Sequence, residues 1–541
     1  MGGPRMLTRT GQSAGRRRVD PRGIRSRPRF RRAAWASAAM LAVAALLAVY
    51  VRLSDTYPVT SNSANILLMA SDMLHGNLLL HGWFMSDVSF YTTELPQYAL
   101  LELFFGVHPA TAHLAAAMTY TLAFLLAVLL AWGPRHGHRL ARTLVVGGIM
   151  LAPQLGAGVA NLDLAVGHVG TSVPLLLIWL IVDRAGRTAS SWRIPALVAI
   201  GLAWALIADP LVLLVGVAPV LVVAGIRVGQ GIVTERNVWV RRDELLLGGA
   251  ALAAVALAWG TERLLAALGG YVVQALPFTV MPSRLWPQLH TTFWCVLQLF
   301  GADPRGRTGI WLGIASLHMV SLVLVGAALL AVARRFLNGV RLVDQLLAVA
   351  IVLNVGVFAA TSASGAGPHE LAVIVPFGAA LAARMLADRW ASRAPAGSRA
   401  AGMLVLAGYL AGLGGELAQP AVPPDNERIA SWLAAHRLGY GLGVFSDSSS
   451  ITVDSGGLVR VRPLEPVTLP LQPRWWMADQ AWYDARANRA TFLVFHFGHG
   501  LGNWVPSRPL LTRYLGNPRR VYYTGRYVVL VWDKNLLRDV R

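Results

Sequence analysis

The sequence has little of several residue types that organise soluble domains. Its 541 residues include one cysteine, Cys295, and one lysine, Lys534. A single cysteine excludes an intrachain disulfide, so any exported part must be stable through its own core. Charged residues make up 14% of the chain, whereas about 25% is usual in a soluble globular protein. The composition therefore excludes an ordinary soluble domain and indicates an integral membrane protein.

Several catalytic and nucleotide-binding motifs are also missing. The sequence contains no Walker loop, no G-x-S-x-G elbow and no HExxH motif. It therefore argues against an ATP-driven transporter and against a nucleotide-sugar donor bound in the cytoplasm. His136 and His138 resemble a metal-binding pair, but their basic loop contains no carboxylate. We also reject a nucleic-acid partner, because the arginines behind the net charge of +21 lie where membrane topology places them.

Long apolar runs are abundant. Hydrophobic residues make up 55% of the chain and the mean hydropathy is +0.51. A membrane-spanning helix needs about 17–25 apolar residues, and the sequence offers about eleven such segments. The predicted spans are 33–51, 110–132, 143–161, 169–183, 194–208, 210–226, 245–266, 308–333, 345–362, 370–387 and 400–418. The sequence thus predicts an α-helical polytopic membrane protein.

Basic residues between the spans predict their direction. They gather in alternate loops, at 133–142, 183–193, 227–244, 334–341 and 388–399. Because basic loops stay in the cytoplasm, we expect the N-terminus inside and, with an odd number of spans, the C-terminus outside. We interpret 194–226 as two spans divided at Asp209, since a single span would reverse the later basic loops. The arginine-rich tail 1–32, expected to be disordered, leads into a retained signal anchor.

The chain changes character after the last span. Pro420, Pro423 and Pro424 end that span, and Asp425 is a candidate N-cap for a short helix over 425–437. Strand-like runs follow at 451–453, 458–463 and 491–497, and a hairpin over 519–533 turns at Thr524-Gly525. We expect residues 419–541 to form a compact extracytoplasmic α/β domain.

The first external loop, residues 52–109, is the most polar part of the predicted membrane domain (33–418). It contains Asp55, Asn62, Asn65, Asp72, His75, His81, Asp87 and Glu94. A long polar loop directly after a first span can fold over the helices and line a pocket at the water boundary. We therefore expect the chemistry of the protein to lie here.

This organisation resembles the GT-C superfamily of membrane glycosyltransferases, and among them actinobacterial relatives of the protein mannosyltransferase and RgtA/B/C/D-like families. The resemblance is carried by HGNLLLHGWFMSDVSFYTTELPQY in the first loop, GHVGTSVP before the fourth span, and the outer domain with SITVDSGG. It implies a polyprenyl-phosphate sugar as donor and a cell-envelope glycan, lipid or protein as acceptor, on the outer face of the plasma membrane. It also implies transfer with inversion, in which an acidic residue of the first loop takes the acceptor proton or organises the acceptor.

The sequence departs from the family pattern at one important position. Asn62 stands near the place where the acidic residue is expected, and an amide cannot act as a base. Asp55 and Asp72 are therefore the alternative catalytic candidates. We expect a helix over 61–75 that places Asn62, Asn65 and Asp72 on one polar stripe facing a hydrated cavity.

Other polar residues are candidates for substrate binding. They are Asn62, Asn65, His75, His81, Trp83, Asp87, Glu94, His168, Arg284 and His290. Trp83 is predicted to stack on a sugar ring, although an interfacial anchor explains it equally well. Glu94 fits a helix cap as well as a binding role. Arg284 and His290 are the best basic candidates for the lipid phosphate, because arginine offers a bidentate fork.

Three further sites have two interpretations each. Asp209 is either a functional carboxylate at membrane depth or part of a tight external turn. His369 and Glu370 open the tenth span and could pair with each other instead of meeting substrate. Asp163 shares a short external loop with His168, where both could simply be solvated.

Two other function classes stay open. A transporter or flippase of lipid-linked precursors would show two similar halves, and no internal repeat is visible. A non-catalytic relative that binds lipid-linked sugar would account for Asn62. The sequence offers no clear set of metal ligands, so we predict no cofactor and leave dependence on a divalent metal open, together with the sugar and the oligomeric state.

Overall fold

The computed structural model describes most of the chain. The described residues are 28–134, 137–153, 168–185, 192–235, 242–275, 279–337, 339–362, 367–422, 426–465, 469–496 and 508–541. The chain forms two compact units, and the boundary between them lies inside the first helix. The first unit ends at Leu46, and the second runs from Leu47 to Arg541. His136, Asp163 and Asp425, three residues singled out from the sequence, lie outside the described residues.

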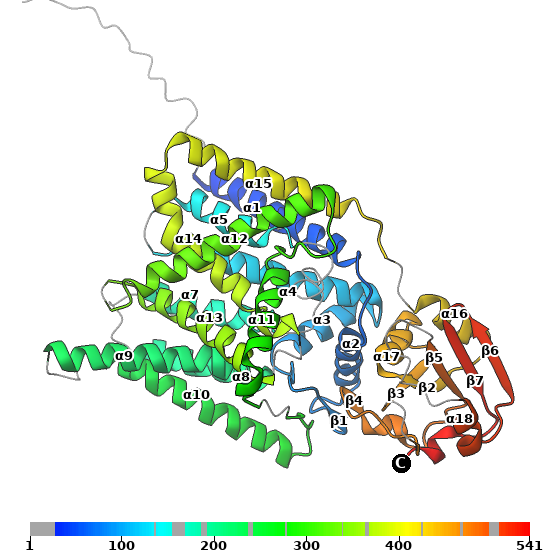
Figure 1. Ribbon diagram of the computed structural model, residues 1–541. Helices are drawn as coiled ribbons and strands as arrows, with labels where there is room; N and C mark the ends of the chain where they lie inside the picture. The colour runs from blue at the N-terminus through cyan, green and yellow to red at the C-terminus, as the bar shows by residue number, and fades with distance from the viewer. Residues whose placement is uncertain are drawn as a thin grey trace, which may run out of the picture. The chain divides into compact units, whose positions relative to one another are not determined.

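Each of the eleven predicted spans overlaps a helix in the described part of the chain (Figure 1), and residues 154–161 of the third predicted span lie outside that part. These helices are α1 (Pro28–Ser54), α4 (Pro109–Trp132), α5 (Arg139–Met150), α7 (Ser172–Ala185), α8 (Arg193–Ala208), α9 (Ala218–Glu235), α10 (Arg242–Ala267), α12 (Gly309–Ala333), α13 (Leu342–Ala360), α14 (Ile374–Arg393) and α15 (Ala396–Leu417). Eight described helices are long and apolar enough to cross a membrane, and α8 is a shorter apolar helix. The predicted polytopic helical fold is confirmed.

The predicted break between the fifth and sixth spans is also confirmed. Helix α8 ends at Ala208, and Asp209 before Pro210 has the extended conformation that a following proline favours. A short π-helical turn, η1 (Leu213–Val217), then leads into α9. The chain therefore turns at Asp209 and places this carboxylate at a helix end.

The first loop is folded rather than extended. It contains α2 (Ser61–Leu74), the short strand β1 (Trp83–Phe84) and α3 (Glu94–Phe105). Helix α2 confirms the helix predicted over 61–75; its N-cap Thr60 accepts a hydrogen bond from the backbone N–H of Ser63. A buried core that includes Leu67, Trp83 and Tyr98 joins the loop to Trp482. The loop is thus anchored on the C-terminal part of the chain.

The C-terminal part contains a five-stranded sheet in the order β3-β2-β5-β7-β6. Its strands are β2 (Tyr440–Val444), β3 (Arg460–Leu464), β5 (Phe492–His496), β6 (Arg520–Thr524) and β7 (Tyr527–Val531), and β4 (Ala478–Asp479) pairs with β1 instead. Strand β2 is parallel to both its neighbours, and β7 is antiparallel to β5 and β6. Residues Gly525 and Arg526 form the turn of the predicted hairpin, one position later than expected.

Apolar side chains cover both faces of this sheet. Successive residues of β5, such as Phe492 and Leu493, belong to two separate cores, because successive side chains of a strand point to opposite faces. One core includes α16 (Glu427–Ala435) and α17 (Phe445–Asp454), and the other includes α18 (Arg508–Leu515) and the 3-10 turn η7 (Leu536–Asp539). The predicted α/β character of this region is confirmed.

One predicted strand is wrong. Residues 451–453 belong to α17, where Ile451 and Val453 are buried. Helix α17 packs against α2 of the first loop (Figure 1). A three-residue β-branched run does not distinguish a strand from a buried helix face, and here the tertiary contact decides. The sequence interpretation also missed β2, whose two glycines weaken a strand pattern.

Candidate functional site

A cavity of about 670 Å³ lies beside the ends of α8, α10 and α13. Leucine, valine, isoleucine, alanine and phenylalanine side chains form most of its wall. The polar residues in the wall are Asp87, Ser89, His168, Asp209, Glu262, Tyr271, Gln274, Asn354 and Glu370. A mostly apolar cavity with a few convergent polar groups is the usual form of a small-molecule site. We therefore treat it as the candidate functional site.

A buried histidine joins two carboxylates at this cavity. Nδ1 of His168 lies 2.7 Å from Oδ2 of Asp209, and its Nε2 lies 3.0 Å from Oε2 of Glu370. All three side chains are buried. His168 lies just before α7, Asp209 follows α8, and Glu370 belongs to η5 (Pro368–Leu371), which precedes α14. The cluster thus links three segments that are far apart in the sequence.

The remaining acceptors of Asp209 are also used. Its carboxylate accepts hydrogen bonds from Thr171 Oγ1 and, at 2.8 Å, from the backbone N–H of Leu211. Burial opposes the charged form of both His168 and Asp209. Their mutual attraction outweighs it, so the pKa of His168 is raised well above its ordinary value and that of Asp209 is lowered. His168 is therefore held as an imidazolium between carboxylates.

Asp87 lies next to this cluster and is held by the backbone around it. The N–H groups of Ser89 and Phe90 donate to the carbonyl of Ala208 at 2.9 and 3.1 Å. These bonds fix the loop against the end of α8. Burial raises the pKa of Asp87, while the neighbouring His168 opposes that rise. In the described part of the chain its carboxylate receives no side-chain hydrogen bond, so it has capacity for a ligand.

Glu94 lies close to the same group of residues. It begins α3, and its carboxyl group lies against Gly170 so closely that a Cβ at this glycine would overlap it. Thr93 Oγ1 donates a hydrogen bond to Glu94. Burial raises the pKa of Glu94 to about 7. This carboxyl group is therefore partly protonated near neutral pH.

The first loop also builds one wall of the cavity. The backbone N–H groups of Tyr271, Val272 and Gln274 donate to the carbonyls of Leu79, Trp83 and Ser86, at 2.9 to 3.1 Å. His81 adds a hydrogen bond of 2.6 Å between its Nδ1 and the Gly269 carbonyl. The loop therefore positions Tyr271 and Gln274, although His81 itself is exposed and does not line the cavity.

The predicted polar stripe on α2 does not face one cavity. Asn62 is exposed, and Asn65 is fully buried with its Oδ1 accepting from Ser449 Oγ of α17 at 2.6 Å. Asp72 accepts from Asn77 Nδ2 at 2.6 Å and from Trp83 Nε1 at 2.8 Å. Asn62 thus faces solvent, Asn65 contacts helix α17, and Asp72 contacts the loop that follows α2. The partners differ because different segments pack against successive turns of α2.

Other predicted site residues also lie outside the cavity wall. Trp83 is 1% exposed and packs edge-on against Trp482, so it offers no open ring face to a sugar. The carbonyl of Asp55 accepts the backbone N–H of Val422, and burial raises the pKa of its carboxyl group against the effect of Arg52.

The predicted basic residues lie at the surface. His75 is exposed and contacts the carbonyl of Ser71 through Nδ1 at 2.7 Å. Arg284 ends the 3-10 turn η3 (Pro282–Arg284), and His290 lies in α11 (Leu285–Leu299); both are exposed. His290 Nε2 accepts a hydrogen bond from Trp294. Of the predicted substrate-binding residues, the structure brings Asp87 and His168 to the cavity, with Glu94 beside them.

Sequence reasoning missed five polar residues of the wall. They are Ser89 in the first loop, Glu262 in α10, Tyr271 and Gln274 after it, and Asn354 in α13. Glu262 and Asn354 could have been found, because a polar residue within a predicted span is a functional candidate by default. No local pattern marks the other three. Across the described residues, no three or more histidine, cysteine, aspartate or glutamate side chains are arranged to hold a metal ion.

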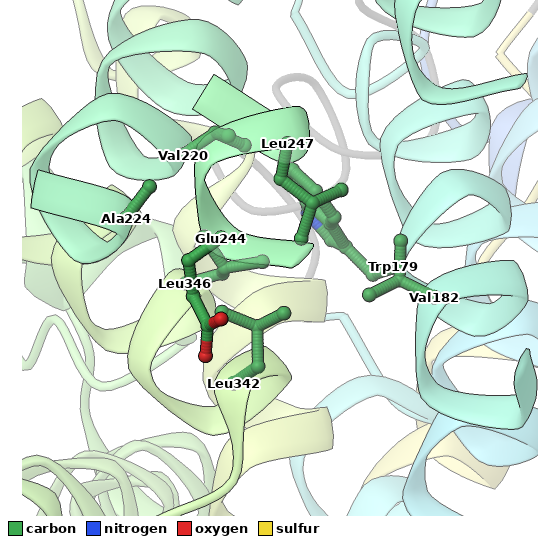
Figure 2. A pocket seen from close by; sticks show the side chains of 8 residues that line it. All are labelled: Trp179, Val182, Val220, Ala224, Glu244, Leu247, Leu342 and Leu346. Atoms are coloured by element: carbon green, nitrogen blue, oxygen red, sulfur yellow. The ribbon is translucent and has the colours of Figure 1, made fainter. Parts of the chain in front are cut away.

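A second cavity lies between α7, α9, α10 and α13, and Figure 2 shows the eight side chains around it. Trp179, Val220 and Leu346 form part of its apolar lining, and the carboxylate of Glu244 lies near Leu342 and Leu346. Its volume is about 10 Å³, which is room for about one water molecule. It is too small for a sugar and does not compete with the larger cavity as a substrate site.

Comparisons with known proteins identify the fold. No protein-family model and no curated protein matches the chain. The crystal structure of ArnT from Cupriavidus metallidurans bound to undecaprenyl phosphate is similar, with a TM-score of 0.54 and 12% identity over 92% of this chain and 98% of that one. The apo structure of the same protein gives 0.46 and 12% over 94% and 99%. Identity this low establishes the fold alone. The chain therefore has the fold of the ArnT structure.

Proposed function

We propose that the protein is a glycosyltransferase that uses a polyprenyl-phosphate sugar as donor. It transfers the sugar, with inversion at the anomeric carbon, to a glycan, lipid or protein of the cell envelope. The reaction takes place on the outer face of the plasma membrane, and residues 419–541 form an extracytoplasmic domain. This proposal rests on the fold together with one observation, the amphipathic cavity at the end of α8.

The wall of the cavity suits a lipid-linked sugar. Asp87 and the His168 cluster supply polar groups for a sugar and an acceptor, while Leu213, Val273 and Phe358 belong to an apolar wall for the first part of a lipid chain. The ArnT structure with the same fold holds undecaprenyl phosphate, a lipid of this class. A soluble sugar nucleotide has no long apolar group that would cover so much apolar surface.

Asp87 is the best candidate for the base. Its carboxylate takes the proton of the acceptor hydroxyl while the acceptor oxygen bonds to the anomeric carbon. The bond from that carbon to the phosphate oxygen breaks, and polyprenyl phosphate leaves with the bonding electrons. Because burial raises the pKa of Asp87, the carboxylate is a stronger base than one in water. The lack of a side-chain partner in the described structure leaves its oxygens open to the acceptor.

The other acidic groups have contacts that fit positioning rather than proton transfer. Asp209 already accepts three hydrogen bonds, and both nitrogens of His168 meet carboxylates. Asp72 is engaged by two side-chain donors, and Asp55 does not line the cavity. We therefore assign the base to Asp87 instead of either sequence candidate.

The phosphate requires a separate group of donors. Arg284 and His290 remain our candidates, because α11 packs against η5, which carries Glu370. Gln288 Nε2 of the same helix donates to the Thr361 carbonyl at 2.9 Å, which ties α11 to the end of α13. These contacts support the proposal, because α11, which contains His290 and directly follows Arg284, packs against a segment of the cavity wall.

Sugar transfer in membranes tests the proposal. Membranes containing the wild type, Asp87→Asn, Asp55→Asn or Asp72→Asn are supplied with radiolabelled polyprenyl-phosphate sugars. We expect Asp87→Asn to lower the rate by about 100- to 10,000-fold, the range for loss of a general base. Asp55→Asn serves as the matched control outside the cavity and should transfer at nearly the wild-type rate.

Protein amounts and melting temperatures separate loss of catalysis from loss of folding. Asp72→Asn should lower the melting temperature, because Trp83 and Asn77 lose a charged acceptor. Wild-type transfer by Asp87→Asn would refute its role as base. Donor binding without transfer by the wild-type protein would instead favour a non-catalytic lipid-linked-sugar binder.

A further inference from the structure

One amide in the cavity wall has a donor that the protein does not use. Asn354 is 2% exposed and lines the cavity, yet its Nδ2 has no hydrogen-bond partner among the described residues. It lies in α13, within a helix that can span a membrane. A buried amide that is left unpaired is costly, more so at membrane depth. The geometry therefore points to an acceptor atom that a ligand brings.

The charges around the cavity restrict what that ligand is. Four carboxylates face it, from Asp87, Asp209, Glu262 and Glu370, and among the described residues His168 is the one histidine in the wall. Neither arginine nor lysine occurs in the wall that the structure describes. His168 is already shared between Asp209 and Glu370, so its charge does not offset Asp87 or Glu262. The wall keeps an excess of negative charge.

We infer that this cavity accepts a neutral or amine-bearing sugar and rejects a sugar acid, with Asn354 donating a hydrogen bond to a sugar hydroxyl. The inference rests on the proposed function and names the class of sugar on the donor. A hydroxyl oxygen satisfies the unused N–H of Asn354. A carboxylate on the sugar would lose its water and meet the net negative charge of the wall, where His168 is already shared between Asp209 and Glu370 and does not offset Asp87 or Glu262.

The test measures binding to purified protein, so that it does not depend on turnover. Three polyprenyl phosphates that carry a neutral hexose, an amino sugar or a hexuronic acid are compared as ligands. We expect the uronic acid donor to bind at least about 100-fold more weakly than the neutral one. Glu262→Gln should narrow that gap, because it removes one negative charge without changing the shape of the side chain.

Two variants of α13 test the amide. Asn354→Leu should weaken binding of the neutral donor by about tenfold, the usual effect of losing one hydrogen bond. Val352→Leu lies on the same helix with a 60% exposed side chain and should bind the donor as the wild type does. An unchanged affinity in Asn354→Leu, with a normal melting temperature, would exclude the amide from the sugar site.

Binding and transfer together distinguish this inference from the proposed function. Equal binding of the neutral and acidic donors would overturn the inference whether or not transfer occurs. Selective binding of the neutral donor without transfer would uphold the inference and refute the enzyme. Failure of all three donors to bind would overturn both.

Discussion

At the scale of single residues, neighbouring side chains in the cavity differ in how many hydrogen-bond partners they already have within the protein. His168 has both ring nitrogens against carboxylates, whereas Asp87 has no side-chain hydrogen bond in the described structure. Removing the imidazole would leave Asp209 and Glu370 as buried charges without their partner, which is strongly destabilising. Removing the Asp87 carboxylate leaves no side-chain donor without its acceptor and costs only a backbone hydrogen bond and the attraction of His168, which keeps its two other carboxylates. Loss of function without loss of folding is therefore expected at Asp87 and not at His168.

Glu94 gives a prediction on pH. Its pKa is about 7 in the folded chain, against an ordinary value of 4.5. Between these two values the folded state holds a proton that the unfolded state has released, so stability falls as pH rises through this range and is level above about 7. Glu94→Gln stays neutral at every pH. Relative to this variant, the wild type should lose melting temperature from pH 5 to pH 8.

The measurement is thermal unfolding in detergent, followed by tryptophan fluorescence at several pH values. Taking the difference between wild type and Glu94→Gln cancels the titration of His168, which both proteins share. Glu427→Gln, at an exposed position at the start of α16, is the control and should leave the pH profile as in the wild type. A wild type that gains stability over the variant as pH rises would contradict a raised pKa.

At the scale of elements, the sequence predicted the parts that a local pattern determines. The helix over 61–75, the break at Asp209 and the final hairpin each have such a pattern, in a cap, a proline and a turn glycine. Residues 451–453 were predicted wrongly because their helix is selected by packing on α2, which no local pattern encodes. Tertiary contacts overrule propensity where a short apolar run is buried.

The candidate site was predictable to a similar extent. Asp87, His168 and Glu94 were named from the sequence, and Asp209 and Glu370 were noted with an alternative explanation for each. The meeting of Asp209 with His168 depends on how α7 and α8 pack, a contact across 41 positions. The stripe predicted on α2 failed for the opposite reason. Helical periodicity gives the face of a residue but not the partner on that face.

Strand β2 gives a prediction at this scale. A Cβ added at Gly441 would overlap the ring of Phe492 on the adjacent strand β5. Gly441→Ala should therefore lower the free energy of unfolding by about 1–3 kcal/mol, the usual cost of overpacking. Phe492→Leu in the same chain should recover part of the loss, because it vacates the space that the new methyl group needs. Denaturant unfolding of the two single variants and the double variant measures this coupling.

Gly439→Ala is the matched control, since its nearest neighbour would be a carbonyl oxygen at 4.0 Å. This substitution should change the free energy of unfolding little, because the added methyl group makes only an ordinary van der Waals contact. Additive losses in the double variant would mean that the ring of Phe492 is not what excludes a side chain at Gly441.

At the scale of the whole molecule, ion pairs join several helices at the ends that the basic loops predict to be cytoplasmic. Arg384 of α14 bonds Asp183 of α7, at 2.8 Å, and Asp344 of α13. Arg142 of α5 bonds Asp388 of α14 at 3.0 Å. Helix α13 runs from this network toward Asn354 in the cavity wall. The network and the cavity therefore lie toward opposite ends of the bundle, as the predicted topology requires.

The final prediction concerns the orientation of the protein in the membrane. In a Cys295→Ser background, Leu458→Cys provides a thiol at a position that is 76% exposed in the C-terminal part, and Ser398→Cys provides one in the loop predicted to be cytoplasmic. A membrane-impermeant maleimide should label the first variant in intact cells and the second only after permeabilisation, because the positive-inside pattern places basic loops in the cytoplasm. The reverse labelling would place the cavity on the cytoplasmic side. A donor sugar would then have to be used before its lipid crosses the membrane, and the outer-face reaction would be ruled out even if transfer itself is observed.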